Sequence, residues 1–75
     1  MFKINASLVR RLMFERELNI SALAKATRLN PFTARKIVHD GARVNGATVG
    51  RLAKFFGVNG EDLLETRKDD SHDVL

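Results

Sequence analysis

Hydrophobic residues along the chain recur at the spacing of helices. In the first segment they stand at i, i+1, i+4 and i+5, which places them on a single stripe of a helix. The stripe consists of Leu8, Val9, Leu12 and Met13. The pattern predicts a helix over about 5–17, with Asn5 as its N-cap because an asparagine oxygen accepts from a free backbone N–H of the first turn. No segment shows the clean alternation of a strand.

Further signals predict three more helices and a short helical turn. We expect these elements over about 20–27, 31–39, 47–56 and 60–64. Candidate caps precede each of them, namely Asn19, Asn30, Asn45 or Gly46, and Asn59. Pro31 suits the first position of a helix, where its missing N–H is not needed, and Gly57 suits the end of the fourth helix. The segment 66–75 has no apolar periodicity, so we interpret it as a disordered acidic tail.

Length and composition limit the possible classes of protein. A chain of 75 residues is expected to form one all-α domain, here residues 1–65. It has no cysteine, which excludes disulfides and thiolate metal sites. The sequence lacks both a membrane-length apolar run and the apolar stretch of a signal peptide, so we expect a cytoplasmic protein without a membrane partner.

Charge is distributed unevenly along the sequence. Residues 1–58 hold 11 basic and 3 acidic side chains, a net charge of +8, whereas residues 59–75 hold 2 basic and 6 acidic ones, a net charge of −4. A basic body favours a polyanionic partner such as DNA. Ordinary solubilising charge is the alternative interpretation, and charge alone does not separate the two.

The second and third predicted helices are the most informative part of the chain. Only about three residues, 28–30, separate them, and such a short turn is typical of a helix-turn-helix. On a helical wheel, the third helix places Ala34, Ile37 and Val38 on one side. The opposite side carries Phe32, Arg35, Lys36 and His39. This second face has the width of a helix that enters the major groove of DNA, where long basic side chains reach phosphates or guanine.

Two stretches resemble one family at this point. They are Leu23-Ala24-Lys25-Ala26-Thr27-Arg28-Leu29-Asn30, followed by Thr33 and Ile37, and Thr48-Val49-Gly50-Arg51-Leu52-Ala53-Lys54-Phe55-Phe56-Gly57-Val58, followed by Asp62-Leu63-Leu64. Together they resemble the lambda-repressor-like, Cro-type (Xre) helix-turn-helix family. The resemblance implies a compact five-helix domain whose third helix enters the major groove. It also implies a regulator, commonly a repressor, that binds paired half-sites as a dimer.

Carried over by position, the resemblance implies the base-reading residues, and helix starts, charge and apolar character indicate the other contacts. The base readers would be Pro31, Phe32, Thr33 and Lys36, with Arg35 beside them. The expected phosphate contacts are Ser21, Arg43, His39, Asn45 and Thr48. Phe55, Leu63 and Leu64 form a candidate dimer patch. Phe32 has the alternative role of a core or dimer residue, and the charged residues that of plain solvated side chains. We interpret Arg10, Arg11 and Arg16 as solvated charges of the first helix.

Three departures from the family pattern carry expectations of their own. Arg28 stands where the family usually has glycine, at a position that often needs a positive φ. Pro31 and Phe32 replace amide side chains, so Phe32 is expected to pack on a thymine methyl group instead. Met13 and Val38 replace a buried Arg–Glu pair, which predicts that these two apolar side chains meet in the core.

The function expected from the sequence is sequence-specific binding of double-stranded DNA by a transcriptional regulator, most simply a repressor that is a homodimer at least on DNA. Two other classes stay open: an antitoxin-like or other protein-interaction module, and a DNA-binding accessory protein of a mobile element. We expect no enzymatic activity, cofactor or metal. Ser71, His72 and Asp73 match a catalytic triad only in composition, because neighbours in a flexible tail do not hold its geometry.

Overall fold

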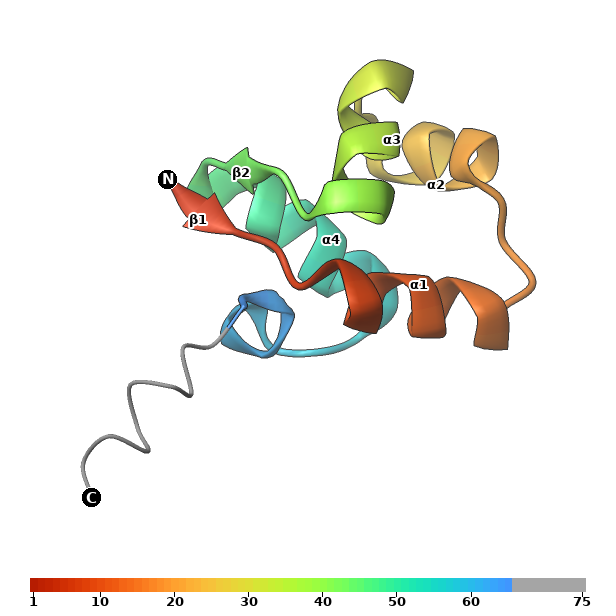
Figure 1. Cartoon of the computed structure of the whole chain (residues 1–75). Helices are drawn as coiled ribbons and strands as arrows, with labels where there is room; N and C mark the ends of the chain where they lie inside the picture. The colour runs from red at the N-terminus through yellow and green to blue at the C-terminus, as the bar shows by residue number, and fades with distance from the viewer. Residues whose placement is uncertain (66–75) are drawn as a thin grey trace.

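The computed structural model describes residues 1–65, which form four α-helices, two short strands and one helical turn (Figure 1). In chain order these are β1 (Phe2–Lys3), α1 (Ala6–Glu15), α2 (Ile20–Thr27), α3 (Pro31–Asp40), β2 (Arg43–Val44), α4 (Gly46–Phe56) and the 3₁₀ turn η1 (Gly60–Leu63). α1 and α4 lie below α3 in Figure 1, and α2 lies beside α3, to its right. The segment 66–75, predicted as a tail, lies outside the described residues.

Asparagine caps define where the helices begin, as the sequence predicted. The side-chain oxygens of Asn5, Asn19, Asn30 and Asn45 accept hydrogen bonds from backbone N–H groups two or three residues later, at 3.2, 2.7, 2.7 and 2.9 Å. These bonds satisfy N–H groups that have no partner within their helix. α2, α3 and α4 each end at a left-handed residue: Arg28, Gly41 and Gly57.

The two strands were not predicted, because two residues each are too short to show alternation. β1 and β2 pair antiparallel, with Phe2 opposite Val44 and Lys3 opposite Arg43. An isolated bridge joins Ile4 to Leu64, and the N–H of Glu65 donates to the carbonyl of Lys3 at 2.9 Å. The start of the chain is therefore held between the segment after α3 and the segment after η1.

The five-helix count is not confirmed. The residues expected to form a fifth helix make one 3₁₀ turn, capped by no side-chain hydrogen bond from Asn59. Its last residue, Leu63, is fully buried, so the turn closes the bottom of the core. The described residues are thus mostly helical, with four α-helices.

A single core lies between the helices. Its buried members are Ile4, Val9, Met13, Leu23, Ile37, Val38, Val44, Val49, Leu52, Ala53, Phe56 and Leu63. Met13 and Val38 are each only 6% exposed, and both belong to this cluster. Both therefore lie in the core, as expected for apolar residues that replace the family's buried Arg–Glu pair. Within residues 1–65, no helix combines the length and apolar character needed to cross a bilayer.

Candidate nucleic-acid interface

The turn between α2 and α3 brings the two helices into close contact. Arg28 adopts the left-handed conformation, with φ 59° and ψ 39°, as the family's usual glycine had suggested. The N–H of Leu29 then donates to the carbonyl of Ala24 at 2.9 Å, and the Leu29 side chain packs against the core. Ala24 is itself buried, so its small side chain lets the backbone of α3 approach.

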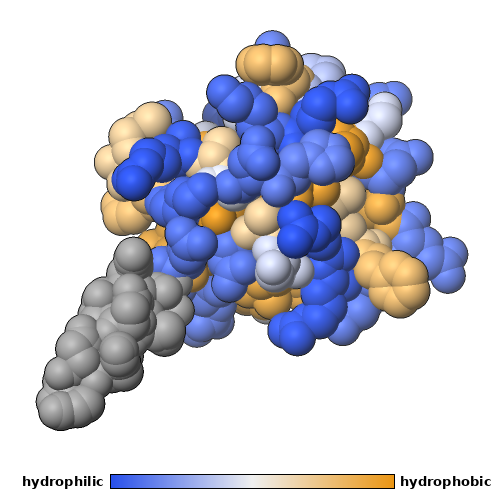
Figure 2. All heavy atoms as spheres, in the orientation of Figure 1, coloured by the Kyte–Doolittle hydropathy of each residue, from blue (hydrophilic) through white to orange (hydrophobic). Residues whose placement is uncertain are grey.

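α3 has one buried face and one exposed face, as the helical wheel predicted. Ala34, Ile37 and Val38 are buried. Phe32, Arg35, Lys36 and His39 are exposed, and Phe32 leaves 66% of its surface open. Hydrophilic residues cover much of the molecular face around α3, with isolated hydrophobic groups projecting between them (Figure 2). The described part of the chain therefore leaves the proposed recognition face of α3 uncovered.

The first turn of α3 holds its side chains in a defined arrangement. Pro31 occupies the first helical position and is exposed, while the N–H of Phe32 donates to Asn30 Oδ1 at 2.7 Å. Thr33 is half-buried. One turn further along, Lys36 Nζ lies 5.3 Å from the centroid of the Phe32 ring, a cation–π contact. Two expected base readers thus form one unit on the exposed face.

The C-terminal end of α3 is fixed by cations from elsewhere in the chain. The Arg10 guanidinium donates to the carbonyl of Val38 at 2.7 Å and to that of His39 at 3.5 Å. Lys3 Nζ donates to the carbonyl of Asp40 at 2.7 Å. Cations at the C-terminus of a helix satisfy its free carbonyls and interact favourably with its dipole. They also set the position of α3 relative to α1 and β1.

The prediction that Arg10 and Arg16 are solvated charges agrees with their exposure but is incomplete, because both also donate to backbone carbonyls. Arg10 holds α3, and Arg16 donates to the carbonyl of Phe56 at 2.9 Å with its guanidinium 5.2 Å from the Phe56 ring centroid. Both acceptors are backbone carbonyls of distant segments, which no local pattern in the sequence reveals. Arg11 is exposed, as expected.

The expected phosphate contacts all reach the surface but come from separate elements. Ser21 is exposed in the first turn of α2, and His39 is exposed in the last turn of α3. At the start of α4, Asn45 is exposed and Thr48 is half-buried, with the N–H of Thr48 bonded to Asn45 Oδ1. Arg43 is exposed on β2. The structure brings Asn45 and Thr48 together and leaves Ser21 on another helix.

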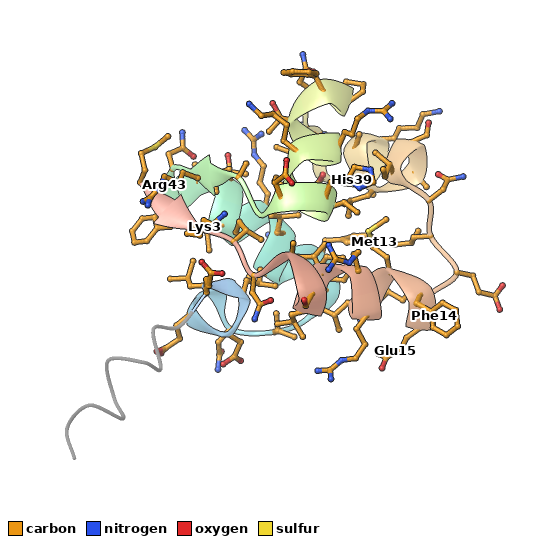
Figure 3. All side chains as sticks on the ribbon, viewed as in Figure 1. Lys3, Met13, Phe14, Glu15, His39 and Arg43 are labelled. Carbon is orange, nitrogen blue, oxygen red and sulfur yellow. The ribbon has the colours of Figure 1, made fainter. Side chains whose placement is uncertain are left out.

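Lys3 is a candidate that the sequence analysis missed. It pairs with Arg43 across the strands, and Figure 3 shows the two labelled side chains at the same end of the molecule. The ammonium of Lys3 also lies at the carbonyl of the last residue of α3. A second cation thus stands beside Arg43, the residue predicted to anchor a phosphate. Only the strand pairing, which was not predicted, could have indicated this.

The three residues predicted to contact a second copy do not form one surface patch. Leu63 is fully buried, whereas Phe55 and Leu64 are half-buried. Phe55 stacks edge-on against Phe56, with ring centroids 5.0 Å apart. A proposed dimer contact therefore has to rest on Phe55 and Leu64.

Other kinds of site find little support in residues 1–65. An open hollow of about 340 Å³ lies between α2 and α4, lined by Ala26, Thr27, Arg28, Arg51, Lys54 and Phe55. It contains no acid–base pair suited to catalysis. The described residues include no group of three or more His, Asp or Glu side chains placed to hold a metal ion. Ser71, His72 and Asp73 lie outside the described part.

Comparison with known proteins agrees with the helix-turn-helix geometry. The model of the Cro/C1-type HTH DNA-binding domain matches residues 9–69, which is most of the chain and includes α2, α3 and α4. No curated protein and no solved structure matches the sequence. With its short α2–α3 turn and exposed α3, the chain belongs to the Cro/C1-type helix-turn-helix DNA-binding family.

Proposed function

We propose that this protein is a sequence-specific regulator that binds double-stranded DNA with α3 in the major groove. The observation that carries the proposal is the exposed face of α3, on which Phe32, Arg35, Lys36 and His39 stand opposite a fully buried face. A single helix fits the major groove of B-DNA, and side chains of this kind contact base edges there. The function proposed is regulation through binding, without an enzymatic step, cofactor or metal.

Phosphate contacts and base contacts have separate tasks in this proposal. Ser21, Asn45 and Thr48 lie at helix N-termini, where the N–H groups without a cap bond bind phosphates, while Arg43 adds positive charge and His39 a further polar contact. These contacts position the protein on the duplex and release counterions. Pro31, Phe32, Thr33, Arg35 and Lys36 then read the bases.

On DNA, the protein acts as a homodimer in this proposal. Two copies of α3 would occupy half-sites about 34 Å, or one helical turn, apart. Of the predicted dimer patch, the half-buried Phe55 and Leu64 remain as residues for a second copy to cover. Occupation of paired half-sites blocks access to a promoter, which makes repression in the cytoplasm the simplest regulatory outcome.

The test is selection of binding sites from a random duplex library, followed by titration of the selected duplex. We expect a defined motif, and we expect Lys36→Ala to weaken binding or relax the preference by roughly 1–3 kcal/mol. Lys54→Ala is the matched control, because Lys54 is an exposed lysine in the last turn of α4. Absence of any DNA complex at low salt would overturn the proposal, and equal effects of the two variants would overturn the role of α3.

A further inference from the structure

Phe32 is an exposed aromatic side chain on a backbone that is held in place. Two-thirds of its surface is open, and it belongs to neither the core cluster nor the residues packed against it. Its backbone is nonetheless set by Pro31 at the first helical position and by the cap bond to Asn30. An exposed phenyl ring held at the start of a helix is placed to contact an apolar group of a partner.

Lys36 gives this ring a charged companion. Its ammonium lies 5.3 Å from the Phe32 ring centroid, and both side chains stand on the exposed face of α3. A cation over the ring is attracted by the ring's quadrupole, and two-thirds of the Phe32 surface remains exposed beside it. The two side chains therefore present one apolar and one cationic group within a few ångströms of each other.

In the major groove, each of these groups has a specific complement. The only apolar group on the base edges is the C5-methyl of thymine, and the ammonium pairs best with O6 and N7 of guanine. Base pairs are stacked about 3.4 Å apart along the duplex. A ring and an ammonium about 5 Å apart can therefore contact two adjacent base pairs, one with the methyl group and one with the guanine.

We propose that the Phe32–Lys36 pair recognises a 5-methylpyrimidine next to a guanine. This inference rests on the proposed DNA-binding function. Thymine followed by guanine presents this combination. 5-Methylcytosine followed by guanine presents it too, because the methyl group occupies the same place on the pyrimidine. Uracil and unmethylated cytosine lack the methyl group. The proposal therefore predicts that cytosine methylation can restore binding to a site whose thymine has been replaced.

The first experiment removes one methyl group from the DNA. Each thymine of the selected duplex is replaced in turn by deoxyuridine, and binding is measured by fluorescence anisotropy. At the thymine beside a guanine we expect roughly four-fold weaker binding, which corresponds to about 0.8 kcal/mol for one buried methyl group. Cytosine at that position should bind as weakly as uracil, and 5-methylcytosine should restore most of the affinity.

Protein variants assign the effect to Phe32. In Phe32→Ala the difference between thymine and uracil should disappear, because the ring that contacts the methyl group is gone. Phe14→Ala is the matched control: Phe14 is 83% exposed at the end of α1, and Figure 3 shows it pointing away from the rest of the body. This variant should keep the full four-fold difference. Circular dichroism verifies that both variants fold.

A second substitution in the DNA tests Lys36. Replacing the neighbouring guanine by 7-deazaguanine removes the N7 acceptor and should weaken the wild type several-fold but not Lys36→Met. Specific binding in which no uracil substitution matters, or a uracil effect that persists in Phe32→Ala, would overturn the inference and leave the proposed function standing. Failure to bind any selected duplex would overturn the proposed function itself.

Discussion

Gly41 stands where the chain leaves α3 and turns into β2. Its φ is 68°, in the left-handed region, and a Cβ atom there would collide with the carbonyl oxygen of Ile4. Gly57 ends α4 with a similar φ of 72°, but a Cβ atom there would meet nothing within 4 Å. The two glycines therefore separate the cost of the backbone conformation from the cost of a collision.

We predict that Gly41→Ala is much more destabilising than Gly57→Ala. The left-handed conformation costs an alanine about 1 kcal/mol, so Gly57→Ala should lower the free energy of unfolding by that amount. Gly41→Ala adds the displacement of the chain at Ile4 and should cost about 3 kcal/mol. Urea denaturation measures both values. Equal losses in the two variants would mean that the segment before α1 moves freely away from Gly41.

Arg28 provides the opposite test, because a non-glycine residue holds the left-handed position. Arg28 ends α2 with a φ of 59°. Arg28→Gly should raise the free energy of unfolding by about 0.5–1 kcal/mol, because the relieved strain outweighs the larger entropy that glycine loses on folding. The thermal midpoint should rise by a few degrees. A lower midpoint would show that the Arg28 side chain, which lines the hollow beside α4, contributes more than the strain costs.

At the scale of elements, the position of α3 depends on contacts that local sequence does not encode. The caps and apolar stripes predicted the four helices, because each signal lies within a few residues of the helix that it defines. β1 and β2 were not predicted, because their pairing joins residues about 40 positions apart. The same holds for Arg10, whose acceptor, the carbonyl of Val38, is 28 positions away.

We expect Arg10→Met to destabilise the fold by about 1–2 kcal/mol. The substitution keeps the apolar stem and removes a charged hydrogen bond of 2.7 Å to a carbonyl at the end of α3. Arg11→Met is the control, since both arginines are exposed on α1 but, within residues 1–65, only Arg10 of the two donates to the end of α3. This variant should change stability by less than about 0.5 kcal/mol. Denaturation of both variants decides the matter: similar stabilities would mean that Arg10 contributes nothing to holding α3.

For the whole molecule, the sequence predicted which residues of α3 are exposed better than it predicted which residues of other segments lie near them. A helical wheel needs only the residues of one helix, so Phe32 and Lys36 were placed correctly on the exposed side. Lys3 was missed because it reaches α3 only through the fold. Leu63 was wrongly predicted to be a surface residue of the dimer patch, because the sequence does not show which of two adjacent leucines fills the core.

Net positive charge and positioned cations make different predictions for binding to DNA. If Arg43 contacts a phosphate, Arg43→Ala should weaken binding about equally for all sequences and reduce the slope of log affinity against log salt by about 1. Arg51→Ala removes the same charge from α4, where the guanidinium donates to the carbonyl of Arg28 at 3.4 Å. A charge that contacts no phosphate releases no counterion, so this variant should keep the wild-type slope. Titrations between about 50 and 200 mM salt distinguish the two cases. Equal reductions in slope would show that the basic body attracts DNA through its overall charge, without the specific anchor that β2 provides in this proposal.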